Sequence, residues 1–175
     1  MRAFLALWPD SETALAIDRW RSLCWRNLPG AVPVQNLHLT LAFLGDIERA
    51  QVERLTEALD RISAERIEVP LCRVGYQVDQ NMLWLEPGPE LAEQAAPLHR
   101  LVDAARHASG KAGIAVRKGL FRPHVTLARR VEVTASSPLM EPSFSLVAED
   151  FHLVSSERRP GGPHYRIVRS WPSSQ

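Results

Sequence analysis

Two copies of one short motif hold the residue types that could do chemistry. The segment 38–42, His-Leu-Thr-Leu-Ala, recurs 86 residues later (124 minus 38), at 124–128, as His-Val-Thr-Leu-Ala. Both copies lie in apolar, strand-like segments, and side chains alternate between the two faces of a strand. The histidine and threonine of each copy therefore share a face, while the aliphatic residues face a core. Two such strands across a cleft would present two imidazoles and two hydroxyls.

That set of side chains suits acid–base chemistry on a phosphodiester. One imidazole can take a proton from an attacking water while the other gives a proton to the leaving oxygen. An unperturbed imidazole has a pKa near ~6.5, so one ring can be neutral and the other protonated near neutral pH. We therefore predict His38 and His124 as the catalytic pair, with Thr40 and Thr126 binding the phosphoryl oxygens. A single histidine–threonine pair is more often a packing or surface feature, and it is the duplication that favours catalysis.

A basic stretch surrounds the second motif and could draw an RNA backbone towards the cleft. It consists of Arg117, Lys118, Arg122, Arg129 and Arg130. Ordinary solvated charge is the alternative interpretation. Phe121 and Trp8 are candidates for stacking on a base, although core packing is the more common fate of such rings.

The remaining histidines and the two cysteines do not predict a metal site. His99 and His107 fall on a helical face with charged neighbours. His152 and His164 have no second ligand at a metal-binding spacing, although His152 or Tyr165 could line the cleft. The cysteines form no Cys-x-x-Cys pair, and no phosphate-binding Gly-Lys-Ser/Thr loop or Gly-x-Ser-x-Gly elbow occurs. We expect no metal and no cofactor.

The hydrophobic pattern predicts the elements that position these residues. Strands are predicted at 2–8, 37–44, 66–78, 81–86, 113–117, 124–129, 144–154 and 164–170, helices at 11–26, 52–62 and 91–110, and a loop at 131–142. Several strands follow one another directly, which indicates an α+β fold with a largely antiparallel sheet. No long linker occurs, so 1–175 is predicted to be one domain. The last two strands are joined by 158–163, Arg-Arg-Pro-Gly-Gly-Pro, a loop that could line the mouth of the cleft.

Composition excludes several classes of protein. The chain has 175 residues, 45% of them hydrophobic, and a net charge of +1 from 21 basic and 20 acidic residues. That balance argues against a generic polyanion binder but leaves room for a local basic cleft. The apolar N-terminal stretch is too short for a signal peptide and meets Pro9 and Asp10, and no apolar run reaches the length of a membrane span. We expect a cytoplasmic protein.

The chain resembles the 2H phosphoesterase superfamily, whose members carry two His-x-Thr motifs. Five segments resemble its RNA 2',3'-cyclic phosphodiesterase branch, once named 2'-5' RNA ligases. They are Arg-Ala-Phe-Leu-Ala-Leu at 2–7, Asn-Leu-His-Leu-Thr-Leu-Ala-Phe-Leu-Gly at 36–45, Phe-Arg-Pro-His-Val-Thr-Leu-Ala-Arg at 121–129, Phe-His-Leu-Val-Ser-Ser at 151–156 and Gly-Pro-His-Tyr at 162–165. They occur in the same order and span nearly the whole chain.

The resemblance implies a bilobal fold of two pseudo-twofold, interleaved lobes. Two mainly antiparallel sheets would face a central cleft, with helices on the outside. It also implies metal-independent hydrolysis of an RNA terminal 2',3'-cyclic phosphate to a 2'-phosphate. His38 would be the general acid on the leaving 3' oxygen, and His124 would activate water. Thr40, Thr126 and Arg129 match phosphate-contacting residues. Strict alternation places Arg129 on the face opposite His124, so the strand must end, twist or bulge near Ala128 for Arg129 to reach the phosphate.

Other functions remain open at this point. The substrate could be a small nucleotide such as an ADP-ribose cyclic phosphate, and reverse 2'-5' ligation could be a minor activity. The chain could also be an RNA-end-binding module without turnover, but a pure binder would be better served by Arg or Lys, which stay charged. We expect a monomer with no obligate protein partner.

Overall fold

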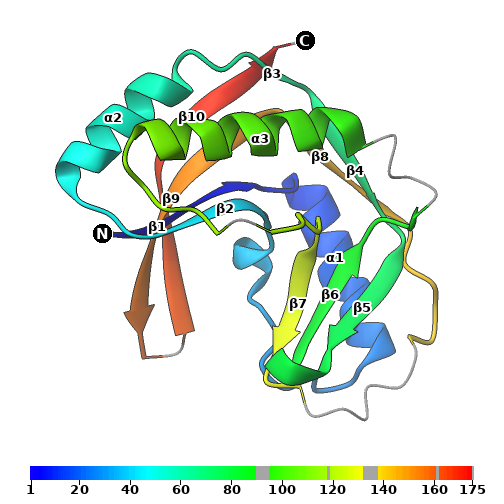
Figure 1. Cartoon of the computed structure of the whole chain (residues 1–175). Helices are drawn as coiled ribbons and strands as arrows, with labels where there is room; N and C mark the ends of the chain where they lie inside the picture. Colours follow the sequence, from blue (N-terminus) through cyan, green and yellow to red (C-terminus); the bar gives the residue numbers. More distant parts are fainter. Residues whose placement is uncertain (90–94, 118, 132–137, 161, 175) are drawn as a thin grey trace.

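The computed structural model describes residues 1–89, 95–117, 119–131, 138–160 and 162–174 (Figure 1). The helices within these residues are α1 (Ser11–Cys24), α2 (Arg49–Leu59) and α3 (Ala96–Lys111), with short 3₁₀ turns η1 (Val34–Asn36) and η2 (Val78–Gln80). The strands are β1 (Arg2–Leu7), β2 (Leu39–Asp46), β3 (Ala64–Glu65), β4 (Ile67–Leu71), β5 (Arg73–Gln77), β6 (Met82–Glu86), β7 (Val125–Arg129), β8 (Phe144–Ala148), β9 (Asp150–Arg159) and β10 (Gly162–Ser174).

The described strands form a large sheet in the order β3-β10-β9-β1-β2-β7-β6-β5 and a small sheet of β4 and β8. All pairings are antiparallel except that of β3 with β10. The large sheet has two arms, β10-β9-β1-β2 and β7-β6-β5, which meet at the pair of Leu39 with Val125. In Figure 1 the β9–β10 hairpin descends at the left, the β5–β7 arm descends at the right, and the helices lie on the outside. The predicted bilobal, mainly antiparallel α+β architecture is confirmed.

The two arms repeat each other in register. The equivalent pairs are Phe4–Phe43 with Met82–Arg129, Leu5–Ala42 with Leu83–Ala128, Ala6–Thr40 with Trp84–Thr126, and Leu7–Leu39 with Leu85–Val125. Both motif strands skip one residue at the same place, Leu41 in β2 and Leu127 in β7, as a β-bulge does. This correspondence of register and bulge supports the pseudo-twofold relation between the lobes.

The strand predicted at 66–78 is two strands that belong to different sheets. β4 pairs with β8, whereas β5 pairs with β6. The chain changes sheet at Cys72. Its N–H donates to the Glu86 carbonyl and its Sγ accepts from the Gly88 N–H, each with a donor–acceptor distance of 3.2 Å. The predicted strand at 144–154 is likewise divided between β8 and β9. Both strands form as predicted locally, but which partner each half pairs with is decided by packing.

The prediction of a strand at 113–117 is wrong, because α3 ends there in a capped turn. Gly113 adopts a left-handed conformation with φ +75°, which glycine accommodates readily. Its N–H donates to the Gly110 carbonyl (3.0 Å), and the Ile114 N–H donates to the Ser109 carbonyl (2.9 Å). These two bonds make a Schellman motif. Residues 114–117 then continue without regular structure.

The predicted helices form with shifted ends. α2 starts earlier than predicted, because Glu48 and Gln51 form a reciprocal capping box at its N-terminus. Lys118, residues 91–94 of the third predicted helix and residues 132–137 of the predicted loop lie outside the described residues.

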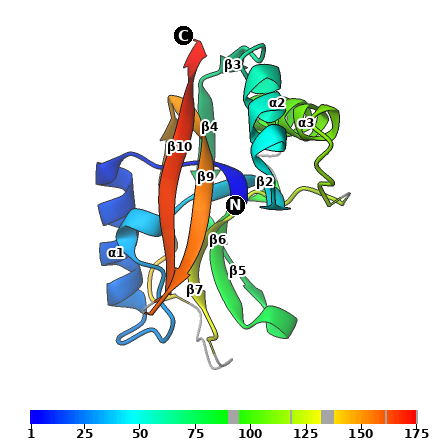
Figure 2. The same ribbon diagram turned by 90° about the vertical axis from the view of Figure 1, so that its left-hand side faces the viewer.

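The two faces of the β1 strand carry different clusters of apolar side chains. Leu5 and Leu7 are fully buried in the main core under the helices. The opposite face carries a smaller group, here called the aromatic cluster, made of Phe4, Ala6 and Val154 with Trp8 and Tyr165 packed against it. Side-chain alternation explains this division. Figure 2 shows the long β9–β10 ribbon of this arm, with α1 on one side and α2 and α3 on the other.

A buried arginine fixes the backbone next to the second motif. Arg21 of α1 is 6% exposed, and its Nη1 donates to the carbonyls of Val32 (2.8 Å) and Leu127 (2.7 Å). Its Nη2 pairs with Asp18. The Val32 N–H also donates to the Leu127 carbonyl (2.9 Å). Arg21 therefore ties the 30–32 segment to β7 at its bulge.

Gly30 permits the close approach of that segment. It has φ +64°, and a Cβ at this position would lie 1.8 Å from the Arg129 carbonyl oxygen. Its own carbonyl accepts a hydrogen bond from the Arg129 N–H (2.9 Å). The backbone of Arg129 is therefore held from both sides, by β6 and by residue 30.

Replacing Arg21 with Met should lower the free energy of unfolding by about 3 kcal/mol, because two carbonyls lose their buried donor and Asp18 loses its cation. Urea denaturation measures the change. The matched control is Arg19→Met, an exposed arginine of the same helix, which should change stability by less than about 0.5 kcal/mol. Equal effects of the two substitutions would contradict the conclusion that Arg21 stabilises the contact between the 30–32 segment and β7.

Candidate active site

The four motif residues meet where the two arms of the sheet join. Leu39 and Val125 are antiparallel partners and are fully buried. Extending this register by one residue in each direction sets His38 opposite Thr126 and Thr40 opposite His124. His38 and Thr126 are buried, and Thr40 and His124 are half-buried. The structure therefore brings the two copies of the motif together on one face of the sheet, opposite the face that Leu39 and Val125 use.

The two imidazoles are oriented by equivalent hydrogen bonds. His38 Nδ1 lies 2.6 Å from the Asn36 carbonyl oxygen, and His124 Nδ1 lies 2.8 Å from the Arg122 carbonyl oxygen. A carbonyl only accepts, so Nδ1 carries the hydrogen in both rings. The Nε2 atom of each ring is therefore the one that remains for chemistry, as base when neutral and as acid when protonated.

Burial depresses the pKa of both histidines. The pKa of His38 falls from 6.5 to about 4, chiefly through burial, with smaller contributions from the positive charges of Arg129 and His124; its bond to the Asn36 carbonyl opposes the shift. Burial also lowers the pKa of His124, as does Arg129, while the Arg122 carbonyl and the Glu86 carboxylate raise it. Both rings are consequently neutral at pH 7 in the free protein, and a bound phosphate anion would shift both pKa values back up.

Aromatic side chains hold His38 from three sides. Trp8 stacks on the imidazole with ring centroids 5.0 Å apart and planes at 23°. Tyr165 meets it edge-on at 5.3 Å, and Phe4 packs at 5.0 Å. The indole N–H of Trp8 donates to the Gln35 carbonyl (3.0 Å), which fixes the stacking ring. His38 thus has little rotational freedom.

His124 lies in a more polar environment. Its ring lies 5.6 Å from Trp84, whose indole N–H donates to Glu86 Oε2 (2.7 Å). Sequence reasoning missed Trp84 and Glu86. A weaker repeat could have found them, because Phe-Leu-Ala-Leu-Trp-Pro at 4–9 corresponds to Met-Leu-Trp-Leu-Glu-Pro at 82–87. The register pairs of β1 with β2 and of β6 with β7 place these two segments in equivalent positions.

The bulge at Leu127 brings Arg129 to the site. Thr126 pairs with Trp84 and Arg129 pairs with Met82, so skipping Leu127 sets Arg129 on the same face as Thr126. Thr126 Oγ1 and Arg129 Nη1 both contact Met82 Sδ, at 3.8 and 3.3 Å. The irregularity required near Ala128 for Arg129 to reach the face of His124 is therefore present.

The equivalent bulge in the first arm places a different residue type at the corresponding position. Phe43, which corresponds to Arg129, lies 6.2 Å from Phe4 between ring centroids and is 61% exposed. The two halves of the site thus share their histidine and threonine but differ around them. One half is aromatic and the other carries a guanidinium.

Phe121 lies outside this group of residues. Its ring meets His99 edge-on at 5.7 Å and lies beneath the Arg106 guanidinium at 5.9 Å, both from α3. It also packs against the main core. These contacts favour the packing alternative for Phe121 over base stacking.

Two further features bear on what the site could hold. The part of the chain that the structure describes contains no group of three or more His, Cys, Asp or Glu side chains arranged around a metal position. A cavity of about 310 Å³ lies beside Trp8 and is lined by Trp8, Pro9, Asp10, Val147, Glu149, Asp150 and His152.

No helix among the described residues is long and apolar enough to cross a membrane.

Two imidazoles, two hydroxyls and a guanidinium on one face are the groups that two-histidine acid–base chemistry on a phosphodiester needs. The family model of the 2'-5' RNA ligase superfamily matches residues 9–159 of the chain. The chain belongs to this superfamily.

Individual relatives are similar over almost the whole chain. The RNA 2',3'-cyclic phosphodiesterase of Aquifex aeolicus is 33% identical, covering 98% of this chain and 96% of the relative. That of Escherichia coli is 26% identical, covering 99% and 97%. The crystal structure of E. coli LigT complexed with 3'-AMP superposes with a TM-score of 0.86 at 26% identity, covering 99% of this chain and 98% of that one.

The buried state of His38 should make the protein sensitive to acid. Above pH 6.5 the ring is neutral in both the folded and unfolded chain, and as the pH falls towards 4 only the unfolded chain takes up the proton. Stability is therefore lost over this window, by about 3 kcal/mol at most. Urea denaturation at pH 7 and pH 4.5 should show a smaller loss in His38→Gln than in the wild type. His107→Gln, an exposed histidine of α3, should lose as much as the wild type. The same pH dependence in all three proteins would contradict the assignment.

Proposed function

We propose that the chain hydrolyses the 2',3'-cyclic phosphate at RNA ends to a 2'-phosphate, without a metal. The observation that carries this proposal is the placement of two Nδ1-anchored imidazoles next to two threonines and Arg129 on one face. The similarity to RNA 2',3'-cyclic phosphodiesterases over nearly the whole chain supports the substrate class.

The reaction needs one proton acceptor and one proton donor. His124 Nε2 takes a proton from water as the water oxygen bonds to phosphorus. The bond from phosphorus to the 3' oxygen breaks, and His38 Nε2 gives its proton to that oxygen. The products are a 2'-phosphate and a 3'-hydroxyl, with His124 protonated and His38 neutral. Exchange with solvent restores both rings for the next turnover.

The remaining site residues bind and polarise the phosphate. The hydroxyls of Thr40 and Thr126 hydrogen-bond its non-bridging oxygens. The Arg129 guanidinium stabilises the negative charge that grows as water attacks. The same negative charge favours protonation of His38. With a pKa of about 4 in the free site, this ring carries no proton to donate from Nε2 at neutral pH. Substrate binding therefore charges the acid as well as positioning the phosphate.

We further infer that the protein acts as a monomer in the cytoplasm. Joining of 2'-5' ends would use the same two rings with a 5'-hydroxyl in place of water: its oxygen bonds to phosphorus, the bond to the 3' oxygen breaks, and a 2'-5' diester and a 3'-hydroxyl form. We expect it to be a minor activity. A small cyclic nucleotide is the second candidate substrate, and comparing kcat/KM on it with that on an oligonucleotide separates the two.

Removing either imidazole should lower kcat by 10²- to 10⁴-fold on an oligonucleotide with a 2',3'-cyclic phosphate end. His38→Ala and His124→Ala are assayed by resolving the 2'-phosphate product, with His107→Ala as the control and circular dichroism to verify folding. EDTA should not inhibit. Near-normal turnover by either variant would refute the acid–base pair. A substrate with sulfur in place of the leaving 3' oxygen needs no acid, so it should partly rescue His38→Ala and not His124→Ala; the opposite pattern would exchange the two roles.

The pH profile of kcat/KM should be bell-shaped and shifted to the acidic side of 6.5. Above the pKa values of the pair both rings are neutral and the acid has no proton, while below them both are protonated and the base is lost. Arg129 lowers both pKa values, so Arg129→Gln should move both limbs to higher pH as well as lower the maximum. Arg130→Gln is the control. Limbs that stay in place in Arg129→Gln would contradict the electrostatic role of Arg129.

A further inference from the structure

The β9–β10 hairpin extends beyond the strand on which it is built. β1 pairs with β9 only over residues 152–155 of β9, through Ala3–Ala6. Residues 156–159 and 162–165 pair only with each other within the described sheet. Figure 1 shows this end of the hairpin projecting from the body of the protein. Residues 157–159 and 162–164 are exposed, although the Asn36 amide donates to the Pro163 carbonyl (3.2 Å) and Tyr165 packs on the aromatic cluster.

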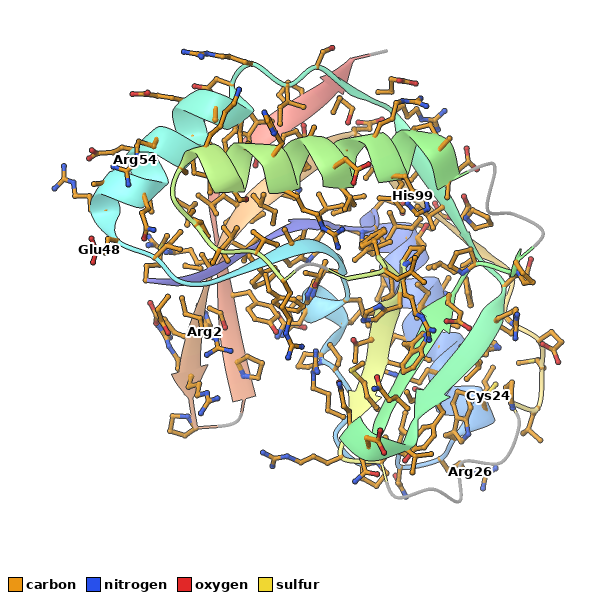
Figure 3. The ribbon with its side chains drawn as sticks, viewed as in Figure 1. Arg2, Cys24, Arg26, Glu48, Arg54 and His99 are labelled. Atoms are coloured by element: carbon orange, nitrogen blue, oxygen red, sulfur yellow. The ribbon has the colours of Figure 1, made fainter. Side chains whose placement is uncertain are left out.

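Register identifies which hairpin residues share the face of His38. Phe4 packs on the His38 ring and pairs with Val154, so Ser156 and Arg158 follow on that same face. Tyr165 pairs with Ser156 and contacts both rings. Arg2 precedes Phe4 by two residues and also belongs to this face. Figure 3 shows Arg2 beside the hairpin.

The opposite face of the hairpin offers a natural comparison. Arg166 pairs with Ser155, and Arg159 is adjacent to Arg158, so both lie on the face away from His38. Arg159 is further occupied by an ion pair with Glu157 (2.8 Å). Neither Arg2 nor Arg158 forms an ion pair with any of the described residues, and both are exposed.

Positive charge runs from the reaction centre along this face. Burial raises the pKa of the Tyr165 phenol, and the positive charges of Arg129 and Arg2 both oppose that shift. Tyr165 is therefore within electrostatic reach of Arg129 on one arm and Arg2 on the other. Arg158 continues the same face towards the hairpin tip. Exposed Phe43, on the neighbouring strand, adds a ring on which an unpaired base can stack.

The other end of the site has the opposite charge. The cavity beside Trp8 is lined by Asp10, Glu149 and Asp150, which would repel a phosphate backbone. An RNA whose 3' end is the cyclic phosphate has chain on one side only. The charges therefore favour one direction for that chain, away from the carboxylates and along the arginines.

We propose that the RNA strand leading to the reacting end lies along the His38 face of the β9–β10 hairpin, over Phe43 and Tyr165, with Arg2 and Arg158 binding its phosphates. This inference rests on the proposed function and adds a direction and a strand-binding surface to it. It makes the preferred substrate an oligonucleotide rather than a small cyclic nucleotide, because only a strand with further phosphates can bind Arg2 and Arg158 while its cyclic end lies at the two histidines.

The test compares adenosine 2',3'-cyclic monophosphate with a short oligonucleotide bearing the same cyclic end. In Arg2→Ala/Arg158→Ala the ratio of kcat/KM for the oligonucleotide over that for the mononucleotide should fall about tenfold. The dependence of log kcat/KM on log salt for the oligonucleotide should become shallower by ~1.4, because each phosphate that a single strand no longer pairs with an arginine lowers the slope by ~0.7. The matched control is Arg159→Ala/Arg166→Ala, which removes two charges from the other face of the same hairpin and should preserve the ratio.

The experiment distinguishes failure of the proposed RNA path along the hairpin from failure of the proposed function. If the wild type hydrolyses both substrates and the two double variants lower the ratio equally, or neither lowers it, the path is wrong while the function stands. If the wild type hydrolyses neither substrate, the proposed function fails. The path is then decided by fluorescence binding of the oligonucleotide, which should weaken in Arg2→Ala/Arg158→Ala and not in the control; equal binding by the two variants would overturn it.

Discussion

The site depends on one antiparallel contact, that between Leu39 and Val125. Each residue follows the histidine of its motif, and both are fully buried. Burial of this pair fixes the register, because a shift by one residue would turn each histidine into the core. The contact also lies where the two repeated arms meet, so the same apolar pair that joins the lobes sets the two imidazoles on one face. Stability of the core and geometry of the site are therefore not separable at this position.

Two nearly identical local motifs nevertheless lie in different surroundings. The matched bulges place Phe43 and Arg129 in equivalent positions, and Trp8 and Glu86 follow the equivalent residues Leu7 and Leu85. The first half therefore surrounds its histidine with rings, whereas the second supplies a guanidinium and a carboxylate. The different neighbours give the two histidines different environments, as the proposed acid and base roles require. The two halves share their strand register and their histidine and threonine, and the side chains next to these residues make the halves different.

The cost of this arrangement is the burial of ionisable groups. Holding His38 between Trp8, Phe4 and Tyr165 depresses its pKa to about 4 and makes folding less favourable in acid. The same enclosure restricts the orientation of the ring and leaves His38 only 9% exposed. In the proposed mechanism, a phosphate anion bound among Thr40, Thr126 and Arg129 reverses the shift, so that His38 is charged only when substrate is present. Burial would thus link binding of the substrate to the protonation that the proposed reaction requires.

The sequence by itself determined the paired motifs, the α+β class, the helices and most strands, because these follow from local periodicity and from a repeat in which four of five residues are the same. It also placed Thr40 with His38 and Thr126 with His124, since alternation along a strand is a local property. Only the tertiary structure decided that 66–78 is divided between two sheets and that 113–117 is not a strand. It also decided that Arg129 reaches the site and that Phe121 packs under α3, because a bulge and a choice of packing partner depend on neighbouring strands distant in sequence.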